Sequence, residues 1–155
     1  MTRGIILDRD GTLIDFWRDA ELGLVTPAFH PDQLRLLPGV TEGLELWRDA
    51  GFVLAIASNQ PDAAKGRVAV EAIARTNAAL VERLADRGIV IAQVETCLHH
   101  PDRHDGGNDA LSRPCACRKP APGMLDAIVA GLGLDRSRSW MIGDTAADLG
   151  AARAA

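Results

Sequence analysis

Short apolar runs alternate along the chain with segments of helical periodicity, and this alternation limits the possible fold more than any other feature. The apolar runs cover residues 4–7, 52–57, 89–96 and 139–142. Helical spacing of apolar residues covers 40–50, 67–87 and 124–132, and a last helix is predicted after Asp144. Strands that alternate with helices form right-handed crossovers and therefore a parallel sheet. We predict a three-layer, Rossmann-like α/β fold with helices on both faces of the sheet.

The length of 155 residues predicts a single domain that spans 1–155. Two segments interrupt the alternation. Residues 16–37 contain two prolines and show no clean period, which predicts a long loop or flap. Residues 97–118 form a polar excursion that holds all the cysteines and three of the four histidines.

Composition excludes several classes of protein. The net charge of −4 argues against a general nucleic-acid binder. No apolar run approaches the roughly 18 residues of a transmembrane helix, so no membrane partner is expected. The first residues do not resemble a secretory signal, and an odd number of cysteines does not suit a secreted disulfide framework. We therefore expect a cytoplasmic protein.

Acidic residues follow the first and the last predicted strands. Asp8 and Asp10 leave the first strand two residues apart, and Asp144 follows the last strand. In open parallel sheets, ligands bind at the carboxyl ends of the strands. Several carboxylates at one edge would form an all-oxygen site that suits Mg²⁺ beside a phosphate. The alternative interpretation is that Asp8 and Asp10 only cap a turn.

Hydrogen-bond donors are predicted at the same edge of the sheet as these acids. Ser58 and Asn59 end the second strand and offer a hydroxyl, an amide and backbone N–H groups to phosphate oxygens. Lys119, one of only two lysines, lies where the chain returns to a helix. Each of these residues alone is more often a turn residue or a solvated side chain.

Four ordered motifs resemble the haloacid dehalogenase (HAD) superfamily. They are LDRDGT at 7–12, SNQ at 58–60, RKPAPGM at 118–124 and GDTAAD at 143–148. Within the superfamily, CLHHP at 97–101 and CACRKPAPGM at 115–124 are similar to the heptose bisphosphate phosphatases. The histidinol-phosphate phosphatases are close relatives of that group, but their cysteine loop is shorter.

The resemblance implies a role for each motif residue. Asp8 would be the nucleophile that forms an aspartyl-phosphate, and Asp10 the general acid and then the general base. Mg²⁺ would be bound by the side chains of Asp8 and Asp144 and by the backbone carbonyl of Asp10, with Asp148 behind them. Phosphate and substrate would be bound by Ser58, Asn59, Arg118 and Lys119. The role of Arg9 is left open.

Two close pairs of residues in the polar excursion predict a second metal site. Cys115 and Cys117 form one pair, and Cys97 with a nearby histidine forms the other. Three thiolates and one imidazole form a structural Zn²⁺ site without an open coordination position. His100 and His104 are rival ligands, but the resemblance favours His99. We therefore expect a zinc loop at 97–117 that orders the segment before Lys119.

The sequence also departs from the superfamily pattern. The cap is minimal, so we expect an open site that takes a small phosphorylated sugar. The C-terminal strand and helix of the superfamily are missing after Ala155, which would leave residues 139–142 as an unpaired edge. Three functions are considered: a sugar bisphosphate phosphatase that releases the C7 phosphate of the heptose, a phosphatase of histidinol phosphate or another small ester, and a non-catalytic phosphate-binding module. A monomer is expected, with a dimer as the alternative.

Overall fold

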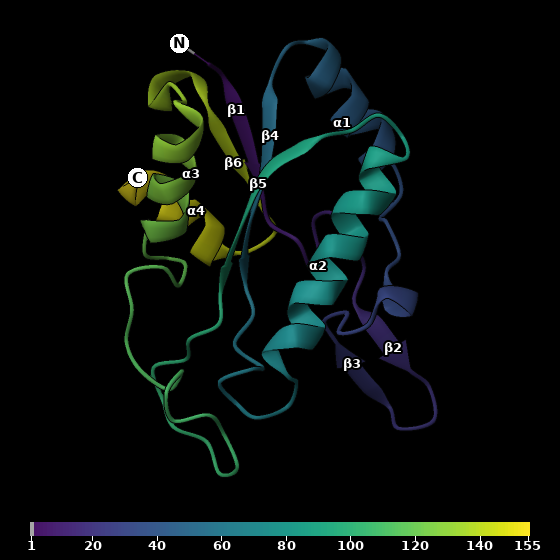
Figure 1. Cartoon of the computed structure of the whole chain (residues 1–155), viewed down its shortest axis with the longest axis vertical. Coiled ribbons are helices and arrows are strands. Elements are labelled where there is room, and N and C mark those ends of the chain that lie inside the picture. Colours follow the sequence, from purple (N-terminus) through teal and green to yellow (C-terminus); the bar gives the residue numbers. More distant parts are fainter. Residues whose placement is uncertain (1) are drawn as a thin grey trace.

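A four-stranded parallel sheet lies between two layers of helices in a computed structural model that describes residues 2–155 (Figure 1). The strands are β1 (Gly4–Leu7), β4 (Val53–Asn59), β5 (Ile91–Cys97) and β6 (Trp140–Ile142), in the order β5-β4-β1-β6. The chain places β4 and β5 on one side of β1 and β6 on the other. The strand order therefore reverses at β1, which is where ligands bind in folds of this kind. The predicted α/β fold is confirmed.

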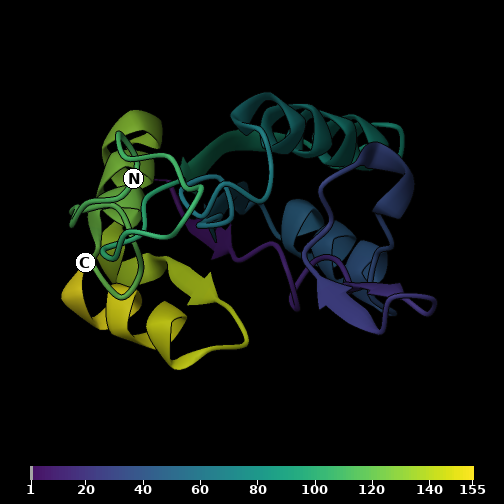
Figure 2. The ribbon, with the colours of Figure 1, turned by 90° about the horizontal axis from the view of Figure 1, so that it is seen from below.

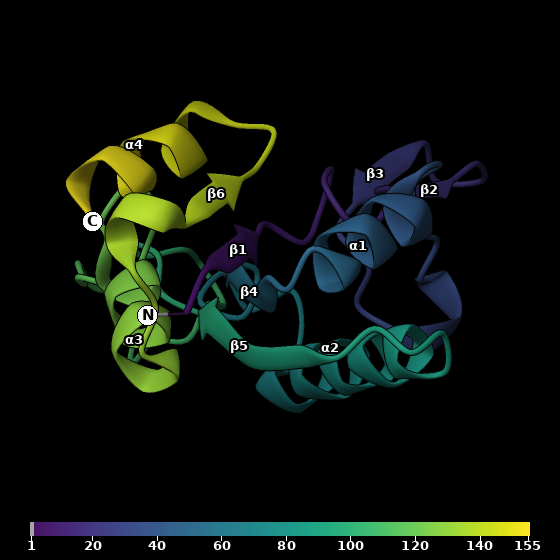
Figure 3. The same cartoon turned by 90° about the horizontal axis from the view of Figure 1, so that it is seen from above.

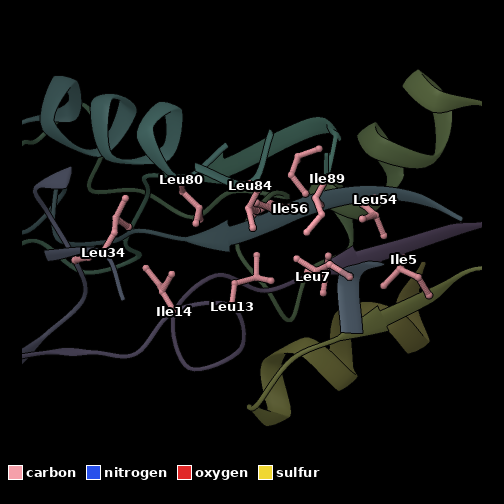
Figure 4. Packing of buried hydrophobic residues seen from close by; sticks show 13 residues of the cluster. Ile5, Leu7, Leu13, Ile14, Leu34, Leu54, Ile56, Leu80, Leu84 and Ile89 are labelled. Carbon is pink, nitrogen blue, oxygen red and sulfur yellow. The ribbon is translucent and has the colours of Figure 1, made fainter. Parts of the chain in front are cut away.

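Helices cover both faces of the sheet (Figure 3). They are α1 (Val40–Asp49) and α2 (Val70–Ala85) on one face, and α3 (Gly123–Leu132) and α4 (Ala146–Ala154) on the other. Successive side chains of a strand point to opposite faces. Ile5 and Leu7 of β1 accordingly share one core with Leu80 and Leu84 of α2 (Figure 4), while Ile6 belongs to the other core with residues of α3. Two hydrophobic cores therefore hold β1 in place.

Residues 16–37 are more regular than predicted. They form the antiparallel strands β2 (Trp17–Asp19) and β3 (Leu24–Thr26), followed by the short 3₁₀ helix η1 (Pro31–Gln33). The Asp19 carboxylate accepts hydrogen bonds from the N–H groups of Glu21 and Leu22 and so closes the turn between the strands. Strands of three residues are too short to show a period of two. The prediction of an irregular loop was therefore wrong in detail.

The boundaries of two other elements also differ from prediction. β4 continues through Ser58 and Asn59, because pairing with β5 extends to Asn59 opposite Cys97. The helix predicted from residue 67 begins only at Val70. Arg67 lies in the preceding loop, where its N–H donates to the Asp62 carbonyl and its guanidinium to the Asp62 carboxylate.

The other helices and strands lie close to their predicted bounds. A second 3₁₀ helix, η2 (Arg136–Arg138), precedes β6. Within residues 2–155, β6 pairs with β1 alone, so it is the expected edge strand, and its Trp140 is half exposed. The described residues contain no helix that is both long and apolar enough to cross a membrane.

The β2–β3 hairpin and the loop at 97–118 extend from the same end of the sheet (Figure 1). The view from below shows them on opposite sides of the carboxyl ends of the strands (Figure 2). The candidate site lies between them.

Candidate active site

Three carboxylates form one cluster at the carboxyl ends of β1 and β6. An oxygen from each of Asp8, Asp144 and Asp148 lies within 4.8 Å of the others. Asp8 directly follows β1, and its N–H donates to the carbonyl of Ile142 in β6 at 2.9 Å. Oxygen ligands of an octahedral Mg²⁺ lie about 3 to 4 Å apart. The donor set therefore fits a magnesium ion, with Asp148 closer to the cluster than the sequence suggested.

The Asp10 side chain is not part of this cluster. Its carboxylate instead accepts hydrogen bonds from Arg9 and from the side-chain amide of Gln60. Arg9, whose role the sequence left open, is fully buried, so its side chain does not point into solvent. The backbone carbonyl of Asp10 stays a predicted metal ligand.

Gly11 allows Asp144 to approach the turn after β1. Its φ of +84° lies in the region that favours glycine. A Cβ atom at this position would overlap the carboxylate of Asp144. A residue with a side chain would therefore force the Asp144 carboxylate out of its present position.

We predict that Gly11→Ala weakens Mg²⁺ binding at this cluster, because the methyl group would displace the Asp144 carboxylate. Gly39→Ala is the matched control, since Gly39 has a φ of +82° but a Cβ atom there would meet nothing within 4 Å. Both variants would lose about 1–3 kcal/mol of unfolding free energy from backbone strain. Calorimetry with Mg²⁺ would measure the difference, and equal Mg²⁺ affinity in both variants would contradict the prediction.

Lys119 lies against the acidic cluster and is almost fully buried. Its Nζ donates to Asp8 Oδ1 at 2.8 Å, to Asp148 Oδ1 at 2.6 Å and to the carbonyl of Ala57 at 2.7 Å. An ammonium group has three N–H donors, so all of them are engaged. A phosphoryl oxygen would have to replace one of these acceptors.

The two carboxylates that share this lysine differ in acidity. Burial raises the pKa of Asp8 to about 6, although Lys119 acts in the opposite direction. Burial would also raise the pKa of Asp148, but hydrogen bonds from Lys119 and Thr145 hold that pKa below its usual range. Asp148 therefore serves as the fixed anion that anchors the lysine.

Asn59 and Ser58 of β4 are partly engaged within the protein. Asn59 Oδ1 accepts from the Lys119 N–H, and Asn59 Nδ2 donates to the Lys119 carbonyl, both at 3.0 Å. The Ser58 hydroxyl is buried and accepts from Gln60 Nε2 at 2.9 Å. Asn59 thus positions the backbone of Lys119 as well as facing the site.

A cavity of about 300 Å³ lies beside Asp8, Asn59 and Lys119. It is lined by Asp8, Asp10, Phe16, Pro27, Asn59, Lys119, Thr145, Ala147 and Asp148. Phe16 and Pro27 flank the β2–β3 hairpin and supply an apolar surface. A neighbouring cavity of about 290 Å³ shares Lys119 and carries Arg113 and Arg118. The predicted substrate residue Arg118 thus lies beside the first cavity.

The predicted zinc ligands lie together at the end of β5. The sulfur of Cys97 is 3.0 Å from that of Cys117 and 3.6 Å from that of Cys115, and His99 Nδ1 is 3.3 Å from the Cys117 sulfur. Sulfur ligands of a tetrahedral zinc ion lie about 3.8 Å apart. The rival His100 bonds Asp102 instead, so His99 is the histidine of this cluster.

Several residues of the site were not predicted. Gln60 is quoted within the SNQ motif but had no role, and it joins Ser58 to Asp10. Phe16 and Pro27 lie in a segment without a period, so no sequence signal could place them. The position of Arg9 between two acids suggested a role at the site, but the sequence does not show which way its side chain points.

Comparison with known proteins assigns the family. A model of the haloacid dehalogenase-like hydrolases matches residues 17–155. The chain therefore belongs to this family of hydrolases.

Individual relatives point to a narrower group. The chain is 34% identical over 151 residues to the D-glycero-beta-D-manno-heptose-1,7-bisphosphate 7-phosphatase of Yersinia pestis, covering 97% of this chain and 74% of the relative. It is 35% identical over 150 residues to the enzyme of that name from Pseudomonas aeruginosa, covering 97% and 75%. The solved D,D-heptose 1,7-bisphosphate phosphatase of B. bronchiseptica, complexed with magnesium and phosphate, matches with a TM-score of 0.76 at 30% identity, covering 98% of this chain and 75% of that one. With the family, these relatives make the chain a phosphoric monoester hydrolase.

Proposed function

We propose that this single domain is a magnesium-dependent phosphatase that removes the C7 phosphate of D-glycero-D-manno-heptose 1,7-bisphosphate. One observation carries the proposal: the Asp8 carboxylate belongs to the cluster of acids that suits Mg²⁺ and also accepts a hydrogen bond from the ammonium of Lys119. The relatives named for this activity support the substrate.

The proposed reaction begins at Asp8. One of its carboxylate oxygens attacks phosphorus, the bond from phosphorus to the sugar oxygen breaks, and an aspartyl-phosphate forms. Asp10, which lines the same cavity, gives a proton to the departing sugar oxygen. Asp10 then takes a proton from water, which attacks the aspartyl-phosphate and releases inorganic phosphate and Asp8.

Asp8, Asp144 and the backbone carbonyl of Asp10 would hold the magnesium ion. When bound, Mg²⁺ supplies positive charge that reduces repulsion between the Asp8 carboxylate and the phosphate dianion. Asp148 would support the metal site while it anchors Lys119. The domain's own donors for the phosphoryl oxygens would be Lys119, Ser58 and Asn59.

Structural zinc at Cys97, His99, Cys115 and Cys117 is the second part of the proposal. Cys117 is two residues from Lys119, and Cys97 ends the strand beside β4. Zinc would therefore fix the segment that carries Arg118 and Lys119 from both ends of the loop.

We predict that His99→Ala lowers the zinc content from about one ion per chain, because one of four ligands is lost. His100→Ala is the matched control, since its ring lies outside the cluster. Elemental analysis of the purified proteins measures the zinc content. Zinc that falls only in the His100 variant would contradict the ligand assignment.

The substrate can be tested by comparing kcat/KM for heptose 1,7-bisphosphate with kcat/KM for histidinol phosphate. We expect the heptose to be preferred, because Arg118 in the neighbouring cavity offers a cation to its second phosphate. The Arg118→Ala variant should lose this preference while it still hydrolyses a monophosphate. A preference of the parent protein for histidinol phosphate would favour that alternative.

A further inference from the structure

Arg9 is the largest side chain of the described residues that is fully buried. A guanidinium is always charged, so its burial requires partners for that charge. Arg9 has them on three sides: the Asp10 carboxylate, the amide oxygen of Asn77 and the carbonyl of Ala28. Among the predicted metal ligands, Arg9 forms side-chain hydrogen bonds only to Asp10. The proposed reaction gives Arg9 no role.

The contacts treat the two Asp10 oxygens differently. Oδ2 accepts from Arg9 Nε at 2.9 Å and from Gln60 Nε2 at 2.6 Å. Oδ1 accepts from Arg9 Nη2 at 3.1 Å and, within residues 2–155, from no other group. A carboxylate oxygen offers about two lone-pair positions. Oδ2 is therefore filled, and one position of Oδ1 stays free in a residue that lines the cavity.

The guanidinium is itself held in place. Arg9 Nη1 donates to Asn77 Oδ1 of α2 at 2.8 Å, and Asn77 Nδ2 donates to Thr96 Oγ1 of β5 at 3.1 Å. Arg9 Nη2 also donates to the carbonyl of Ala28, beside the cavity residue Pro27. The guanidinium is thus held by Asn77 of α2, which is itself bonded to β5, and by the carbonyl of Ala28 after the hairpin.

We propose that Arg9 is a positioning residue that turns Asp10 so that Oδ1 faces the oxygen of the leaving group. This inference rests on the proposed phosphatase function. Because a guanidinium donates in a fixed fork and does not release a proton, it can hold the carboxylate without competing in the transfer. A lysine at position 9 would keep the positive charge, but it could not donate to both oxygens of Asp10 with a fixed planar geometry.

The test uses two substrates that differ in their need for a general acid. An alkyl phosphate needs a proton on its departing oxygen, whereas a nitrophenyl phosphate releases a stable phenolate without one. We expect Arg9→Lys to lower kcat for the alkyl ester by about 10²-fold and kcat for the nitrophenyl ester by less than about tenfold. Asn77→Ala keeps the ion pair of Arg9 and Asp10 but removes one hydrogen bond that holds the guanidinium. It should show the same selectivity with a smaller loss of kcat. Arg75→Lys, on the exposed side of α2, is the control and should change neither rate.

Each result decides the matter. An alkyl-selective loss in Arg9→Lys, or in Asn77→Ala if the first variant does not fold, supports the positioning role. Equal losses for both esters, or no loss, would overturn it and leave Arg9 as a structural residue. A parent protein that hydrolyses neither ester would overturn the proposed function and this inference with it.

Discussion

Asp8→Asn is expected to abolish phosphate release. The amide has almost the same size as the carboxylate, but it is a poor nucleophile and cannot form the aspartyl-phosphate. The loss of a covalent nucleophile costs about 10⁵-fold or more in kcat. The assay is phosphate release from an aryl phosphate with Mg²⁺, with Asp86→Asn on the protein surface as the control.

This experiment also separates enzyme from binding module. A parent protein that releases phosphate and an inactive Asp8→Asn variant would exclude the non-catalytic alternative. Activity that survives in Asp8→Asn would show that another group attacks phosphorus, and the proposed mechanism would be wrong.

Lys119→Met should give the second largest effect, a fall of about 10²–10⁴-fold in kcat/KM. Methionine fills a similar volume but supplies no charge for the phosphoryl group. The same change leaves the buried carboxylates of Asp8 and Asp148 without their cation. Breaking a buried ion pair in this way costs about 3–5 kcal/mol of unfolding free energy.

Lys65→Met is the control, because Lys65 is the only other lysine and lies outside the cavity. Steady-state kinetics and urea unfolding would measure the two effects separately. A Lys119→Met variant with unchanged kinetics would contradict the phosphate-binding role, whatever its stability.

The elements with strong local signals were predicted well from the sequence. The helix at Val40–Asp49 begins after a proline and a glycine and ends before another glycine, and these residues act locally. The hairpin around Trp17–Asp19 and Leu24–Thr26 was missed because its stability comes from cross-strand pairing rather than from a periodic pattern. The end of β4 was placed too early because polar residues usually end a strand, whereas here pairing with β5 carries it further.

The site was predictable to the extent that topology alone positions its residues. The rule that parallel strands end at one edge is sufficient to bring Asp8 and Asp144 together. The hydrogen bonds of Arg9 and Gln60 to Asp10 depend on how side chains turn within the core. These side-chain orientations are set by tertiary packing, so they cannot be predicted from the spacing of residues in the sequence.

The wide sequence separation of the reacting groups has a consequence for newly made chains. Asp8 and Lys119, which share a hydrogen bond, are 111 residues apart. At a synthesis rate of about 5–20 residues per second, the nucleophile leaves the ribosome roughly 5 to 20 s before its lysine. Throughout that interval the nascent chain contains neither Asp144 nor Lys119, so Asp8 lacks both of these partners. The site of a growing chain therefore stays incomplete until the segment around residue 148 has been translated and has packed against the sheet.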